Sequence, residues 1–212
     1  MWYHKSLSEN IKMTGTRAPT KVPVPVIIPH GHGKPHVHSI TMITVLTKNF
    51  NNLSQEKYDE VVERLQFHQI TCTCGHCGCM RKYGRYKRTV WIFGYEIVLR
   101  IQRLQCTSCG KTHAILLDIL IPYSRIPLED CREIILAGET GKSCTAVQEA
   151  NPYIEDGMVL HVRIQFRKHW QQKLLSENIS LQENLIADCF RFFGRQFMQI
   201  RGTPNILFSP ST

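Results

Sequence analysis

Two short cysteine motifs of the same form place the strongest constraint on this chain. The first is Cys74-Gly-His-Cys77-Gly78, and the second is Cys106-Thr-Ser-Cys109-Gly110. Two residues between paired thiolates let both sulfur atoms face one tetrahedral ion, and the glycine that follows permits the positive φ of a tight turn. We therefore expect Cys74, Cys77, Cys106 and Cys109 to bind one structural Zn²⁺ ion.

The 28 residues between the two motifs are typical of a β-hairpin. Residues 83–92 and 95–105 resemble strands joined near Phe93-Gly94, and apolar residues alternate in the second one. This arrangement predicts a zinc ribbon over residues 71–125. Four thiolates would close the coordination sphere, so no hydrolytic role is expected and the chain is not expected to be an enzyme.

The other cysteines leave one alternative open. Cys72 and Cys79 flank the first motif, and either of them could replace a ligand, although neither completes a C-x-x-C-G sequence. Cys131, Cys144 and Cys189 are scattered and are expected to be small core residues.

The rest of the chain predicts an α+β protein with the ribbon followed by helices. Residues 1–41 are rich in proline and are expected to lack regular structure, and residues 42–70 predict a strand and a helix capped by Ser54. Helices are expected over about 127–137, 144–150, 155–175 and 181–193. The helices within residues 126–176 are spaced like a helix-turn-helix, and residues 177–212 would form a last helix and a tail.

Basic side chains gather in two of these segments and predict an anionic partner. The chain has a net charge of +9, and residues 81–103 contain seven Lys or Arg residues against only Glu96. We expect double-stranded DNA to bind along the hairpin and the 155–175 helix. The residues expected to contact DNA are Arg81, Lys82, Arg85, Lys87, Arg88, His161, Arg163, Gln165, Arg167 and Lys168. Of these, Arg163 is a candidate for reading base edges.

Several segments together resemble a known family. They are the first cysteine motif, residues 83–88, residues 101–116 with the second cysteine motif, and Ile121-Pro122-Tyr123. They are similar to a bacterial family of uncharacterised zinc-ribbon proteins, which resembles the N-terminal zinc-finger and helix-turn-helix part of insertion-sequence transposases. The resemblance spans about residues 42–175 and implies a transposon-derived DNA-binding protein. The chain departs from the pattern at Cys72 and Cys79, and at Leu160 and His161 of the expected recognition helix.

Three functional hypotheses follow from these observations. The first is a DNA-binding module without a catalytic domain, because only 37 residues follow the resemblance. The second is an accessory subunit of a transposase whose catalytic chain is separate, and the third is a zinc-ribbon adaptor for an acidic protein. A homodimer is compatible with each. No apolar run approaches the roughly 18 residues of a membrane span, so a cytoplasmic location is expected.

Overall fold

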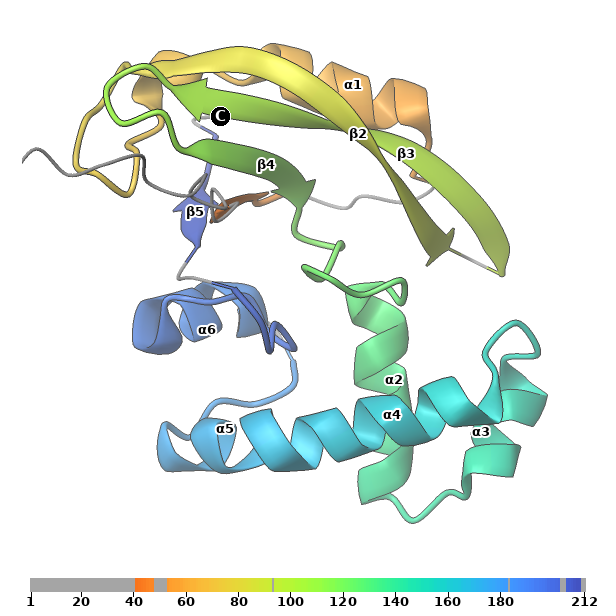
Figure 1. The fold of residues 1–212 in the computed structure, drawn as a ribbon. Helices are drawn as coiled ribbons and strands as arrows, with labels where there is room; N and C mark the ends of the chain where they lie inside the picture. Colours follow the sequence, from red (N-terminus) through yellow and green to blue (C-terminus); the bar gives the residue numbers. More distant parts are fainter. Residues whose placement is uncertain (1–40, 48–52, 93, 183, 203–204, 211–212) are drawn as a thin grey trace, which may run out of the picture. The chain divides into compact units, whose positions relative to one another are not determined.

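The computed structural model describes residues 41–47, 53–92, 94–182, 184–202 and 205–210. Most of the leader that was expected over residues 1–41 lies outside these ranges. The described part is a mixed α+β structure with one five-stranded sheet and several helices (Figure 1).

The strands of the sheet come from three separate parts of the chain. They are β1 (Thr41–Val45), β2 (Met80–Ile92), β3 (Tyr95–Cys106), β4 (Thr112–Leu117) and β5 (Ile206–Phe208), in the order β2-β3-β4-β1-β5. The first three strands of that order pair antiparallel, whereas β4, β1 and β5 pair parallel. The predicted hairpin is therefore present, but its sheet extends beyond residues 71–125 because β1 and β5 complete it.

The hairpin of β2 and β3 extends past the other strands and curves (Figure 1). Its register runs from Met80 opposite Cys106 to Ile92 opposite Tyr95, with one irregularity between Lys82 and Gly84. Gly94, in the turn, has φ +81°. This left-handed conformation favours glycine, which explains the turn residue that the sequence suggested.

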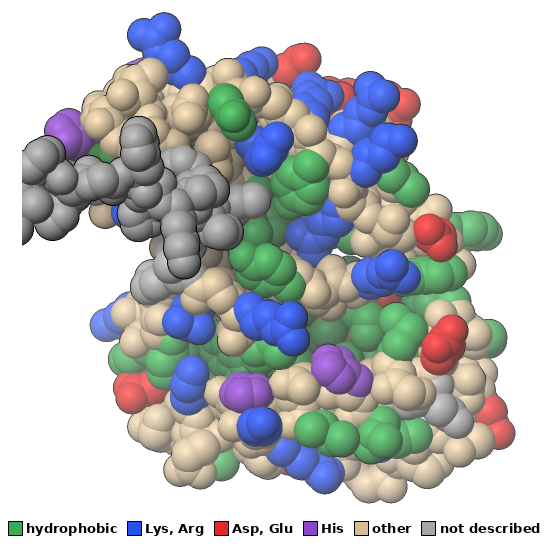
Figure 2. Space-filling model, viewed as in Figure 1, with side chains coloured by type: hydrophobic (Ala, Val, Ile, Leu, Met, Phe, Trp, Pro, Cys, Tyr) green, Lys and Arg blue, Asp and Glu red, His purple; other side chains and the backbone are tan. Residues whose placement is uncertain are grey.

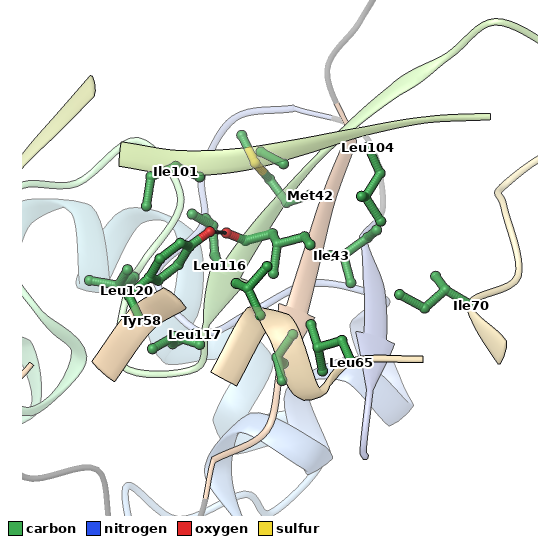
Figure 3. Packing of buried hydrophobic residues seen from close by; sticks show 14 of the residues in the cluster. Met42, Ile43, Tyr58, Leu65, Ile70, Ile101, Leu104, Leu116, Leu117 and Leu120 are labelled. Atoms are coloured by element: carbon green, nitrogen blue, oxygen red, sulfur yellow. Dashed lines mark hydrogen bonds between the residues drawn. The ribbon is translucent and has the colours of Figure 1, made fainter. Parts of the chain in front are cut away.

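One hydrophobic core lies between the sheet and α1 (Gln55–Arg64). Ser54 caps α1 by accepting a hydrogen bond from the Lys57 backbone N–H, which confirms the predicted cap. Tyr58 points from α1 into this core, close to Leu120 and Leu116 (Figure 3). Its hydroxyl donates to the Ile115 carbonyl at 2.9 Å and accepts from the Gln102 N–H at 3.0 Å, so this one side chain joins α1 to β3 and β4.

A second core holds the helices together. These helices are α2 (Leu128–Glu139), α3 (Cys144–Ala150), α4 (Asp156–Phe166), α5 (Gln172–Ser176) and α6 (Leu185–Phe193), and a π-helical turn, η2 (Arg167–Gln171), joins α4 to α5. The predicted helices over 127–137, 144–150, 155–175 and 181–193 correspond to these elements. A short 3₁₀ turn, η1 (Phe67–Gln69), lies between α1 and the first cysteine motif.

Trp170 is the largest side chain of the second core and packs edge-on against Phe193 and Phe197. Side-chain hydrogen bonds link the second core to the sheet. The Gln196 amide donates to the Asp118 carbonyl at 2.6 Å and its oxygen accepts from the Thr44 hydroxyl at 3.1 Å. Gln196 is fully buried, so these bonds satisfy a side chain that would otherwise be costly to bury.

Candidate functional site

Four cysteine sulfur atoms meet at the open end of the β2–β3 hairpin. They belong to Cys72, Cys74, Cys106 and Cys109, and all lie within 4.8 Å of one another. The Sγ atoms of Cys72 and Cys109 are 3.7 Å apart, as are those of Cys74 and Cys106. A tetrahedral site with Zn–S bonds of about 2.3 Å requires sulfur atoms about 3.8 Å apart. The four thiols can therefore hold a metal ion.

The second cysteine motif forms the tight turn that its sequence predicted. The Cys109 N–H points at the Cys106 sulfur at 3.4 Å, and the Gly110 N–H donates to the Cys106 carbonyl at 2.9 Å. Gly110 has φ +72°, which a side chain at this position would disfavour. Cys106 itself is the last residue of β3, so the end of a strand fixes the position of its sulfur.

The first arm of the site has the same form but is one residue shorter. The Gly75 N–H donates to the Cys72 carbonyl at 2.8 Å, the Cys72 N–H donates to the His76 carbonyl at 2.8 Å, and Gly75 has φ +90°. Cys72-Thr-Cys74-Gly75 thus corresponds to Cys106-Thr-Ser-Cys109-Gly110. In both arms, the glycine directly after the second cysteine closes the turn.

The structure therefore differs from the predicted ligand set at Cys77. That side chain is exposed, and its thiol donates to the His68 carbonyl at 3.2 Å instead of facing the other sulfur atoms. Cys72 takes its place because the turn closes at Gly75 and not at Gly78. Cys74 and Cys77 each precede a glycine, so the C-G pair did not decide between the two turns, and the C-x-x-C spacing favoured Cys77. Cys79, also buried, lies beside the group with its sulfur 3.2 Å from that of Cys106.

A buried histidine supports the site from β4. His113 has no exposed surface, and its Nε2 lies 3.3 Å from the Cys72 sulfur, whereas its Nδ1 has no hydrogen-bond partner among the described residues. Burial lowers its pKa and so favours the neutral ring, and the tautomer with its proton on Nε2 would donate to a Cys72 thiolate.

The thiols of the site differ in acidity. Burial raises the pKa of Cys72, so a bound cation would be needed to stabilise its thiolate. Burial also opposes ionisation of Cys106, but the Cys109 N–H and the Cys79 thiol outweigh it and lower the pKa of Cys106 to about 6. Cys106 thus favours the thiolate form even without a bound cation.

The exposed surface of the hairpin is basic. Arg81, Lys82 and Lys87 are exposed along β2, and no carboxylate lies within ion-pair distance of them in the part of the chain that the structure describes. Arg85 instead forms an ion pair with Asp59 of α1 at 3.0 Å. Figure 2 shows Lys and Arg side chains on the face of the molecule that carries the hairpin.

One cross-strand pair on the hairpin joins two like charges. Lys87 lies directly opposite Arg100 in the register of β2 and β3, and both side chains are exposed. Like charges directly opposite each other destabilise a sheet, so folding alone does not favour this pair. A polyanion bound over the hairpin would relieve the repulsion. Arg100 was not among the predicted contacts.

Arg88 has a different role from its neighbours on β2. Its side chain is half-buried, and its Nη2 donates to the Ile121 carbonyl at 2.5 Å and to the Ser124 carbonyl at 2.8 Å. Because strand side chains alternate between faces, Arg88 points away from the face that carries Lys87. Arg88 was predicted to contact DNA, but in the structure its guanidinium group instead holds the loop before α2.

Most of the residues on α4 and η2 that were predicted to contact DNA are at least partly exposed, and one of them turns inward. His161, Arg167 and Lys168 are exposed, and Gln165 is half-buried. Arg163 turns inward, since its Nε donates to the Ile134 carbonyl at 3.4 Å and its side chain packs against Gly138. Its predicted contact with a base edge does not fit this position.

The helices around α4 pack through buried aliphatic side chains. Val147 of α3, Ile134 of α2, and Val159 and Val162 of α4 all belong to the second core. The outer face of α4 carries exposed Leu160 and Ile164 beside its basic residues. This face is therefore less polar than a surface that reads bases mainly through hydrogen bonds.

Part of the chain matches a known protein family. Residues 56–152 match a family described as a domain of unknown function, DUF6431. The matched region contains all four clustered cysteines and the whole hairpin. No curated protein and no solved structure matches the chain. Among the described helices, none is both long and apolar enough to cross a membrane.

Proposed function

We propose that this protein is a zinc-stabilised DNA-binding module. The observation that carries the proposal is the exposed like-charge pair of Lys87 and Arg100 on a hairpin whose base is the cysteine cluster. Both strands end at the site, because Met80 follows Cys79 and lies opposite Cys106. Binding of a metal there would fix the spacing of the two strands and so of their basic side chains.

Zinc is the metal that this donor set favours. Four thiolates in tetrahedral arrangement suit Zn²⁺ or an iron–sulfur centre, and sulfur atoms 3.7 Å apart match the edge of a single-ion site. All four positions are taken by protein ligands, so the ion would have a structural role. In small sites of this kind, the free energy of metal binding is largely folding free energy.

DNA is the partner that the charge distribution favours. Lys82, Lys87 and Arg100, which share one face of the hairpin by their register, would lie along phosphates, which position a protein without reading sequence. His161, Arg167 and Lys168 form a second basic group on α4 and η2, and π-helical turns are frequent at functional sites. The resemblance to the DNA-recognition part of insertion-sequence transposases supports the same partner.

A matched pair of double variants tests this proposal. Lys87→Ala with Arg100→Ala removes one Lys and one Arg from the hairpin, and Lys142→Ala with Arg191→Ala removes the same charges from positions elsewhere. We expect the hairpin variant to bind duplex DNA more weakly, with a log–log salt slope that is lower by about 0.9 for each phosphate that the protein no longer neutralises. The control variant should change both quantities much less.

The same titrations separate DNA binding from the alternatives. Zinc-loaded protein that binds no duplex at low salt would refute the proposal and favour an adaptor for an acidic protein. If both double variants weakened DNA binding equally, the affinity would depend on the total charge of the protein and not on the hairpin. An accessory role beside a separate transposase chain would require DNA binding first, so it rests on the same result.

A further inference from the structure

An open pocket of about 550 Å³ lies beside α4, outside the metal site and the hairpin. Its walls are formed by residues 121–126, the first turns of α4 and Cys131 of α2, together with Met198, Ile200 and Arg201. Its volume falls within the range of about 300–1,000 Å³ that is typical of small-ligand sites. Figure 2 shows hydrophobic side chains in a hollow beside α4, with Lys, Arg and His side chains near its edges.

The lining of the pocket combines an apolar floor with positive charge. Ile126, Val162 and Met198 are buried apolar residues of the floor. Arg125 and Arg201 are exposed at its edge, and no carboxylate pairs with either of them among the residues that the structure describes. Two unpaired guanidinium groups beside a hydrophobic surface favour a ligand that has both an anionic and an apolar part.

The backbone of the first turn of α4 is open to the pocket. Gly157 lines the pocket, and a Cβ atom at this position would meet open space, so the backbone there is accessible. The free N–H groups of a helix N-terminus attract anions. His161 follows one turn later, and the lining also includes an acid, Glu155, the N-cap residue of α4, whose charge opposes the attraction of an anion.

The walls of the pocket hold an unusual backbone conformation. Four described residues other than glycine have positive φ, and two of them are asparagines, which tolerate it. The other two, Tyr123 at φ 64° and Met198 at φ 61°, both line this pocket. Strained residues of this kind are found at ligand sites more often than elsewhere. The bonds that Arg88 donates to Ile121 and Ser124 hold one of these walls in place.

We propose that this pocket binds a small organic anion, with Arg125 and Arg201 holding a phosphate or carboxylate group and the apolar floor holding the body of the ligand. The site is separate from the proposed hairpin surface for DNA, and only His161 and Gln165 belong to both the pocket and the predicted DNA contacts. A ligand in the pocket would touch the exposed side of α4 and could therefore affect what α4 binds.

Calorimetric titration of the zinc-loaded full chain with phenyl phosphate tests the proposal. Inorganic phosphate and phenol serve as the two halves of this probe. We expect phenyl phosphate to bind at least about tenfold more tightly than inorganic phosphate, because only it fills the apolar floor. Arg125→Ala and Arg201→Ala should each weaken binding roughly tenfold, and the matched control Arg191→Ala should leave it unchanged.

The thermal melting curve of each variant serves as the control that the variant is folded. Arg125→Lys and Arg201→Lys provide a second series that keeps the charge and loses the forked donors, and we expect intermediate affinities from it. Phenyl phosphate that does not bind folded protein at millimolar concentration would overturn the proposal. Binding that is equal in the wild type and in both alanine variants would overturn it too.

A short DNA duplex forms the last arm of the experiment. If the two arginine variants weaken duplex binding while phenyl phosphate fails to bind, the arginines belong to a nucleic-acid surface and the small-ligand proposal is wrong. If phenyl phosphate binds as expected and the duplex does not, the pocket stands and the proposed DNA-binding function fails. The two proposals therefore have separate outcomes.

Discussion

Arg88 and Lys87 are neighbours on β2, and the structure predicts opposite consequences for their replacement. Arg88 donates two hydrogen bonds from one charged group to the carbonyls of Ile121 and Ser124. A hydrogen bond to a charged group contributes about 1.5–3 kcal/mol, and bonds that share one donor group are not additive. We therefore expect Arg88→Ala to lower the free energy of unfolding by about 2–4 kcal/mol.

Lys87 is exposed, opposite another exposed cation, so its replacement should hardly change stability. Surface substitutions of this kind usually stay within about 0.5 kcal/mol. Relief of the repulsion from Arg100 would even favour the Lys87→Ala variant slightly. For this variant, we expect lower DNA affinity and a weaker dependence of binding on salt.

Urea unfolding of zinc-loaded protein, followed by tryptophan fluorescence, measures the first effect, and fluorescence anisotropy with a labelled duplex measures the second. Arg88→Lys should recover only part of the stability because an ammonium group does not match the forked geometry of the guanidinium. An Arg88→Ala variant within about 0.5 kcal/mol of the wild type would refute the structural role of Arg88. A Lys87→Ala variant with unaltered DNA binding and salt slope would remove Lys87 from the proposed interface.

Two further predictions concern the cores. Tyr58→Phe leaves the Ile115 carbonyl and the Gln102 N–H without their buried partner, so we expect stability in urea to fall by about 1–3 kcal/mol, and an unchanged midpoint would contradict the packing of α1. Burial raises the pKa of Asp130 from 3.8 to about 6, against an opposing hydrogen bond with Tyr153. The native state therefore holds this proton longer than the unfolded state, and the contribution of Asp130 to stability is highest below about pH 4, falls as the pH rises to about 6 and is then constant. Asp130→Asn should remove this fall in stability. If the urea midpoints of the wild type and the variant changed equally with pH between these values, the carboxyl group would not be buried.

Much of the fold follows from local sequence signals. The hairpin is encoded by alternation and by Gly94, and α3 begins at Cys144 because Ser143 accepts a hydrogen bond from the Ala146 N–H. These features depend on residues close together in the chain, so the sequence was sufficient to predict them. The junction of α4 with α5 through a π-helical turn gave no comparable signal.

The extent of the sheet could not be predicted because it depends on contacts distant in sequence. β1 pairs with β4 and with β5, and the β1–β5 register places Ile43 beside Ile206. A strand of three residues such as β5 carries almost no pattern of its own. The prediction of a ribbon over residues 71–125 therefore left out β1 and β5.

The candidate site was also predicted only in part from the sequence. Three of the four predicted sulfur ligands lie in the cluster, because spacing within a motif limits which thiols can meet. The choice between Cys72 and Cys77 depends on which glycine closes the turn, and both Gly75 and Gly78 have positive φ. The inward positions of Arg88 and Arg163 likewise depend on which elements pack against their strand or helix. A count of charged residues in the sequence does not show this packing.

We propose that Cys72, Cys74, Cys106 and Cys109 bind one metal ion with four thiolates. Titration of the metal-free protein with Co²⁺, followed by absorption spectroscopy and then by displacement with Zn²⁺, tests it most directly when the wild type is compared with Cys72→Ser and Cys77→Ser. We predict about one equivalent of metal, a tetrahedral tetrathiolate spectrum in the wild type and in Cys77→Ser, and a weakened and altered spectrum in Cys72→Ser. Normal binding by Cys72→Ser with loss of the spectrum in Cys77→Ser would contradict the ligand set, and no metal binding by the wild type would contradict the site itself.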